Sequence, residues 1–89
     1  MLERDLSITS PHGLNAQASA KLVQTLAPFH CQAFLLAKGR EVNAKSIMGV
    51  MLLAAGPGTS VLLRAEGPDE ADAVSAVAGL FERKFDEEG

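Results

Sequence analysis

The hydrophobic period of the chain changes within residues 11–20, and this change constrains the fold more than any other feature. Residues 2–9 alternate between apolar and polar positions, which is typical of a half-buried strand with one solvated face. Over residues 16–27 the apolar side chains recur at helical spacing instead. Between the two, Gly13 permits a backbone bend and Asn15 is a preferred helix N-cap. The chain therefore begins as a strand followed by a helix.

A hairpin and a second helix are predicted next. Residues 31–37 form a short apolar run, and residues 41–44 return after a turn that contains Gly39, which predicts two paired strands. Ser46 is a preferred N-cap type and opens an apolar stretch that the Gly-Pro-Gly of residues 56–58 terminates. This stretch is apolar on nearly all sides, which is unusual for a short surface helix.

A fourth strand and a third helix complete the predicted order. Residues 61–66 alternate, and Asp69 is expected to cap the helix that follows. The buried stripe of this helix is expected to be Ala73, Val74, Val77, Leu80 and Phe81. The acidic tail of residues 86–89 is expected to fray. The order β-α-β-β-α-β-α predicts an α+β fold, a two-layer open-faced sandwich with three helices on one face of a four-stranded antiparallel sheet.

Composition narrows the class of protein. The length of 89 residues predicts a single domain, residues 1–89. A net charge of −3 argues against a nucleic-acid platform, which needs a basic face. Cys31 has no second cysteine to pair with, and this fits a reducing compartment. No apolar segment is long enough for a signal peptide or a membrane span, so we expect a cytoplasmic protein without membrane contact and without a cofactor.

The helix start at Asn15 is the candidate site. Unpaired N–H groups and the positive end of the helix dipole make a helix N-terminus suited to an anion or a phosphoryl group. His12 precedes the Gly13 bend, and it is either a phosphoryl acceptor or metal ligand or, as is usual for a lone loop histidine, only solvated. His30 and Cys31 are adjacent but lack a second ligand pair, so no metal site is expected.

Three segments carry a resemblance to a known family: residues 13–22, residues 43–55 and residues 67–71. The longest reads Asn43-Ala44-Lys45-Ser46-Ile47-Met48-Gly49-Val50-Met51-Leu52-Leu53-Ala54-Ala55. They resemble HPr, the histidine-containing phosphocarrier of the bacterial phosphoenolpyruvate–sugar phosphotransferase system. The resemblance covers essentially the whole chain and implies an HPr-like fold.

The chain departs from the family at two positions of the working site. The resemblance aligns Asn15 with the phosphoryl-accepting His and Gln17 with an Arg. Imidazole is nucleophilic near neutral pH, and an Arg guanidinium holds phosphoryl oxygens bidentately. A carboxamide is not such a nucleophile, and Gln17 lacks the charge. The resemblance thus implies a regulatory member that does not carry phosphate; a carrier that uses His12, or an inactivated mutant of a carrier, are the alternatives.

The resemblance also implies a regulatory site and partners. Ser46 matches the position that an HPr kinase phosphorylates in the family, besides its role as a helix cap. Ala20, Ile47, Met48 and Met51 are either core or a docking patch, and polarizable Met suits a surface that meets several partners. The implied partners are enzyme I, the sugar-specific enzymes II, HPr kinase and a transcription regulator.

Overall fold

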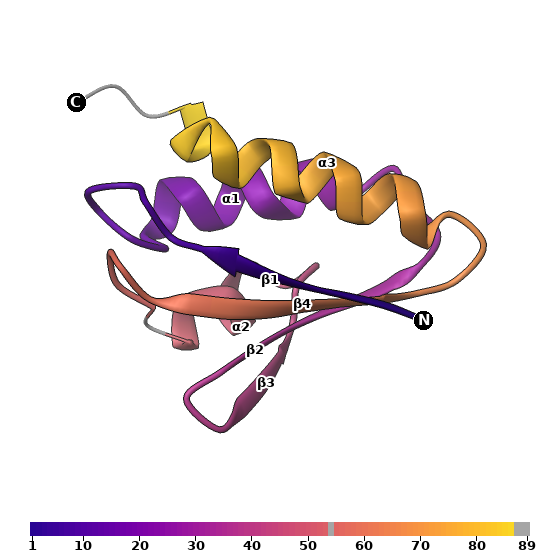
Figure 1. The fold of residues 1–89 in the computed structure, drawn as a ribbon, viewed down its shortest axis with the longest axis horizontal. Coiled ribbons are helices and arrows are strands. Elements are labelled where there is room, and N and C mark those ends of the chain that lie inside the picture. The colour runs from indigo at the N-terminus through magenta and orange to yellow at the C-terminus, as the bar shows by residue number, and fades with distance from the viewer. Residues whose placement is uncertain (54, 87–89) are drawn as a thin grey trace.

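The structure is a computed structural model that describes residues 1–53 and 55–86. Its elements follow the predicted order, with one short turn of 3-10 helix added at the end (Figure 1). They are β1 (Leu2–Ser7), α1 (Ala16–Leu26), β2 (Gln32–Ala37), β3 (Arg40–Asn43), α2 (Ile47–Leu52), β4 (Ser60–Glu66), α3 (Glu70–Glu82) and η1 (Lys84–Asp86).

The four strands form one antiparallel sheet in the order β1-β4-β2-β3. Helices α1 and α3 lie side by side over the sheet (Figure 1), and α2 packs against α1 and β3. The predicted α+β open-faced sandwich is therefore confirmed. In the part of the chain that the structure describes, no helix is long and apolar enough to cross a membrane.

The core lies between the sheet and the helices. Leu6 of β1 is opposite Val61 of β4, and Leu35 of β2 is opposite Leu63 of β4, so alternate positions of the strands point to the helices. These four side chains are buried, and each contributes about 1.5–3 kcal/mol by leaving water. Arg4 shares this face of β1 but is exposed at the edge of the sheet.

Two of the predicted helix caps are confirmed. The Asn15 side chain accepts a hydrogen bond from the N–H of Ala18 at 2.8 Å. The Ser46 hydroxyl accepts one from the N–H of Gly49 at 3.2 Å. Each bond satisfies one of the amide groups that a helix start leaves without an intrahelical partner.

The predicted side-chain cap at Asp69 is wrong. Asp69 does occupy the N-cap position of α3, but its carboxylate makes no bond to that helix. It accepts instead from the N–H of His30 at 2.7 Å and of Cys31 at 2.9 Å. The carboxylate therefore holds the loop before β2. The backbone N–H groups of His30 and Cys31 give this carboxylate two hydrogen-bond donors, whereas a cap of α3 would give it one.

Residue 86, the one described residue of the predicted frayed tail, is more ordered than predicted. Asp86, expected to fray, belongs to η1, and its backbone N–H donates to the carbonyl of Arg83 at 3.0 Å. Phe85 is fully buried, with its ring centroid 4.7 Å from that of Phe81. The Lys21 ammonium donates to the carbonyl of Phe85. The other residues of the predicted frayed tail, 87–89, lie outside the described residues.

Candidate functional site

The loop that enters α1 is held against the segment that follows α2. Gly13 has a φ of +64°, and a Cβ atom there would lie 2.7 Å from the carbonyl oxygen of Ala55. The N–H of Leu14 donates to the same oxygen at 2.9 Å. Only glycine fits this close approach without a shift of backbone, so the position and direction of the start of α1 are set by the 55–56 segment.

The start of α1 offers donors but no nucleophile at residue 15. Asn15 is half-buried, and its carboxamide is occupied with the N–H of Ala18. The N–H groups of Ala16 and Gln17 are left without intrahelical acceptors, and both residues are exposed. This end of the helix can attract an anion through its dipole, while the neutral Gln17 side chain adds hydrogen-bonding capacity without charge.

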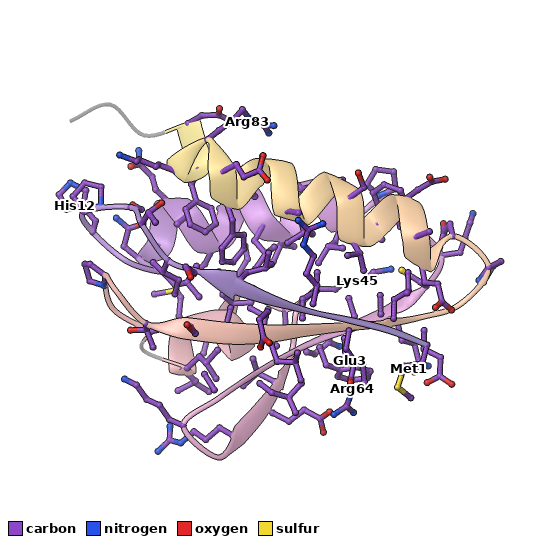
Figure 2. The ribbon with its side chains drawn as sticks, viewed as in Figure 1. Met1, Glu3, His12, Lys45, Arg64 and Arg83 are labelled. Carbon is purple, nitrogen blue, oxygen red and sulfur yellow. The ribbon has the colours of Figure 1, made fainter. Side chains whose placement is uncertain are left out.

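His12 lies at the tip of the loop between β1 and α1, away from the sheet (Figure 2). It is exposed, and among the described contacts its ring has no hydrogen-bond partner. Gly13 and Leu14 separate it from Asn15. The structure therefore places His12 near the helix start in sequence, but it gives no contact that joins the two side chains.

Ser46 lies in a turn that hydrogen bonds hold together. The Asn43 side chain accepts from the N–H of Lys45 at 2.9 Å, and the Asn43 carbonyl accepts from the N–H of Ser46 at 3.1 Å. The Lys45 ammonium reaches across to the carbonyl of Phe29. Ser46 itself is half-buried and extended, with φ −112° and ψ 118°. Its hydroxyl thus sits in a fixed place at the start of α2.

An apolar surface covers the outer side of α2. We call Ile47, Met48, Met51 and Leu52 the α2 patch; their exposed fractions are 42%, 72%, 43% and 64%. Val50 and Leu53 are turned into the core instead. The expectation that part of this helix is exposed is confirmed. Ala20 is half-buried on α1, the helix against which α2 packs.

Sequence reasoning missed Leu52 as a member of the α2 patch. Met48 and Leu52 are four residues apart and so share a helix face, and this spacing could have identified it. One positive charge lies at the patch: the Arg40 guanidinium donates to the carbonyl of Leu52 at 3.2 Å. The Lys45 ammonium is directed instead to the carbonyl of Phe29. No acidic residue lies in the first turn of α2.

The cysteine is not a reactive group of this site. Burial raises the pKa of the Cys31 thiol, and the nearby Asp69 carboxylate raises it further. A raised pKa keeps the thiol protonated, and the thiol is a poor nucleophile and metal ligand in that form. Within residues 1–53 and 55–86, no cluster of three or more His, Cys, Asp or Glu side chains is placed to hold a metal ion.

Known proteins resemble the chain over its whole length. A family model described as the PTS HPr component phosphorylation site matches residues 2–83. A phosphocarrier protein HPr of Xylella fastidiosa is 54% identical over 88 residues, which are 99% of each chain. The HPr-like protein Crh of Halalkalibacterium halodurans is 38% identical over 94% of this chain and all of its own. The crystal structure of HPr-C-His from Thermoanaerobacter tengcongensis superposes with a TM-score of 0.95 at 43% identity, covering both chains completely.

Proposed function

Because the chain belongs to the HPr family of the phosphotransferase system, we propose that it is a docking and regulatory module of that system which carries no phosphate at residue 15. The family is one of phosphocarriers rather than enzymes. The module works in the cytoplasm, with residues 1–89 acting as one HPr-like domain. Its partners are enzyme I, the sugar-specific enzymes II, an HPr kinase and a transcription regulator.

The observation that carries the proposal is the chemistry of the α1 start. The Asn15 carboxamide caps the helix through its bond to the Ala18 N–H. An amide has no lone pair comparable in nucleophilicity to that of imidazole, so transfer from a phosphohistidine to this side chain does not occur. Gln17 cannot supply the positive charge that a guanidinium gives to a transferring phosphoryl group.

The α2 patch supports docking without phosphoryl transfer. A large exposed cluster of apolar side chains on a small domain marks an interaction surface, and Met side chains adapt to several partners. We include Ala20 in this docking surface because it is partly exposed on α1, the helix against which α2 packs. In our proposal this surface carries most of the binding energy, and the positive charge of Arg40, whose guanidinium donates to the carbonyl of Leu52, steers acidic partners to it.

Ser46 supports regulation of the same surface. Ser46 directly precedes Ile47 and Met48 of the α2 patch in the chain. A phosphate on its hydroxyl would therefore place about two negative charges beside these apolar side chains. We propose that an HPr kinase adds this phosphate and that it changes which partners bind.

A competition experiment tests the docking proposal. An active HPr is phosphorylated by enzyme I and phosphoenolpyruvate in the presence of increasing amounts of this protein. We expect the initial rate to fall as the protein occupies enzyme I, with no phosphate appearing on the competitor. A rate that stays unchanged at saturating competitor would show that the protein does not dock to enzyme I. Phosphate on His12 would support the alternative, a carrier that uses this histidine.

A further inference from the structure

We propose that the free edge of β1 binds an extended segment of a partner protein as a fifth strand of the sheet. The segment would carry basic side chains on the face away from the helices, and apolar and acidic side chains on the face toward them. This inference does not depend on the proposed function, because it concerns a different surface.

β1 is the longer of the two edge strands. The sheet order β1-β4-β2-β3 leaves β1 paired on one side only, over all the residues of Leu2–Ser7. Successive residues of a strand direct their backbone groups to alternate sides, so half of these N–H and C=O groups point away from β4. No other described segment bonds to that side. β3, the other edge, is only four residues long.

A hollow of about 270 Å³ runs beside this edge, between β1 and α3. On the helix side it is lined by Ala78, Phe81 and Glu82, and on the strand side by residues 4–7 together with Thr9. Ala78 and Phe81 are buried and form an apolar wall, while Glu82 is exposed. A strand added to β1 would place its helix-facing side chains in this hollow, so main-chain bonds and side-chain burial would act together.

The positive and negative side chains of β1 lie on opposite faces of the sheet. Arg4 lies on the helix side of the strand, whereas Glu3 and Asp5 lie on the open side, as their pairing with β4 requires. Glu3 already accepts from Arg64 at 3.3 Å, and Figure 2 shows this pair on the face of the sheet away from α1 and α3. Asp5 has no ion-pair partner among the residues described.

This pattern argues against a second copy of the chain as the occupant. Two antiparallel registers of a β1–β1 pair overlap most of the strand. In one register, Glu3 lies opposite Asp5 of the second copy, and the two Arg4 residues lie opposite each other. In the other register, the two Asp5 residues lie opposite each other. Like charges directly opposite each other destabilise a strand pair, and inward-pointing charges are a known protection of sheet edges. A partner with Lys opposite the acids and Glu opposite Arg4 meets opposite charges instead.

The edge lies apart from the α2 patch. α3 packs on β1, whereas α2 packs on β3 at the other edge of the sheet. A partner at β1 and a partner at the α2 patch can therefore bind at the same time.

A synthetic peptide tests the proposal. The probe is acetyl-Thr-Val-Lys-Glu-Lys-Val-Thr-amide, which places Lys opposite Asp5 and Glu3, and Glu opposite Arg4. Binding to the full chain is followed by NMR titration with amide hydrogen exchange. We expect saturable binding with slower exchange of outward-facing β1 amides, and about tenfold weaker binding of the charge-swapped peptide Thr-Val-Glu-Lys-Glu-Val-Thr.

Two controls separate strand addition from general attraction. A probe that is N-methylated on the backbone edge facing β1 should lose binding, while one methylated on the far edge should keep it. Asp5→Lys should shift the preference toward the charge-swapped peptide, whereas Glu66→Lys, the same exposed change on β4, should not. Binding that ignores N-methylation, binding that Glu66→Lys alters as much as Asp5→Lys, or no saturable binding would overturn the proposal.

Discussion

The backbone N–H of Leu14 donates to the carbonyl oxygen of Ala55 at 2.9 Å, and this bond ties the start of α1 to the segment after α2. The loop that enters the candidate site and the helix that carries the α2 patch are therefore held in one arrangement. A partner that rests on both contacts a surface whose two parts are already placed relative to each other.

Replacing Gly13 should damage this arrangement. Gly13→Ala puts a Cβ into the left-handed region and 2.7 Å from the Ala55 oxygen, so we expect a loss of about 2–4 kcal/mol in the free energy of unfolding. Gly39→Ala is the matched control, since Gly39 also has a positive φ but has open space around it, and it should cost about 1 kcal/mol. Denaturant unfolding measures both. Equal losses would mean that the close approach of residue 13 to Ala55 adds nothing to the loss in the free energy of unfolding.

The Asp69 carboxylate should make stability fall at low pH. Hydrogen bonds from the N–H groups of His30 and Cys31 lower the pKa of Asp69 below its ordinary value of 3.8. Since the folded-state pKa is depressed, the stabilisation is present above the ordinary pKa and is lost as the pH falls through the lowered one. Asp69→Asn should therefore unfold more easily at neutral pH and lose less stability on acidification.

Unfolding curves from neutral pH down to about pH 2 check this prediction. Asp72→Asn, which removes an exposed carboxylate from the first turn of the same helix, is the control for a change of charge alone. If Asp69→Asn and wild type lose stability in parallel as the pH falls, the two amide bonds do not depend on the ionised carboxylate.

The sequence could predict contacts between near neighbours in the chain, but not contacts between residues that are far apart in it. The alternation of residues 2–9 and the caps at Asn15 and Ser46 depend on near neighbours in the chain, so local patterns were sufficient. Asp69 bonds to residues 38 and 39 positions away, which no local pattern encodes. For the same reason the sequence suggested that Asp69 caps its own helix.

The turn of residues 84–86 was harder to predict for a different reason. Phe85 is buried with a φ of +58°, a conformation that a bulky residue rarely adopts. An acidic tail after a helix is normally frayed, but this turn is held by the contact with Phe81, by the bond from Lys21 and by the bonds between Arg83 and Asp86. In the candidate site, residue type identified Met48, and the four-residue spacing from Met48 could have identified Leu52 as well.

Met48→Asp should abolish docking and leave the fold intact. Met48 is 72% exposed, so a charge there meets water in the free protein but a desolvated surface in the complex. Loss of a central apolar anchor weakens binding by about 2 kcal/mol or more, which is about thirtyfold in affinity. Circular dichroism and titration with enzyme I measure the two effects. Val50→Asp, in which the buried neighbour is changed, should unfold the domain. Undiminished binding of folded Met48→Asp would place the docking surface elsewhere.

Phosphorylation of Ser46 should not unfold the domain. The hydroxyl already accepts from the N–H of Gly49 as the cap of α2, and phosphate oxygens accept from the same donor more strongly. Peptide mapping after incubation with an HPr kinase and ATP should locate the phosphate on Ser46, with little change in Tm. Ser46→Ala should block modification and cost about 1 kcal/mol through loss of the cap. Modification of another residue, or a fall in Tm of several degrees, would contradict this prediction.

The most direct test of the central claim is phosphoryl transfer itself. Wild type, His12→Asn and the double variant Asn15→His/Gln17→Arg are each incubated with phosphoenolpyruvate and enzyme I, and acid-labile phosphate is measured by intact mass. We predict no phosphate on wild type or on His12→Asn, and phosphate on the double variant, because the helix start keeps its free N–H groups and gains a nucleophile and a charge. Stoichiometric acid-labile phosphate on wild type would contradict the account.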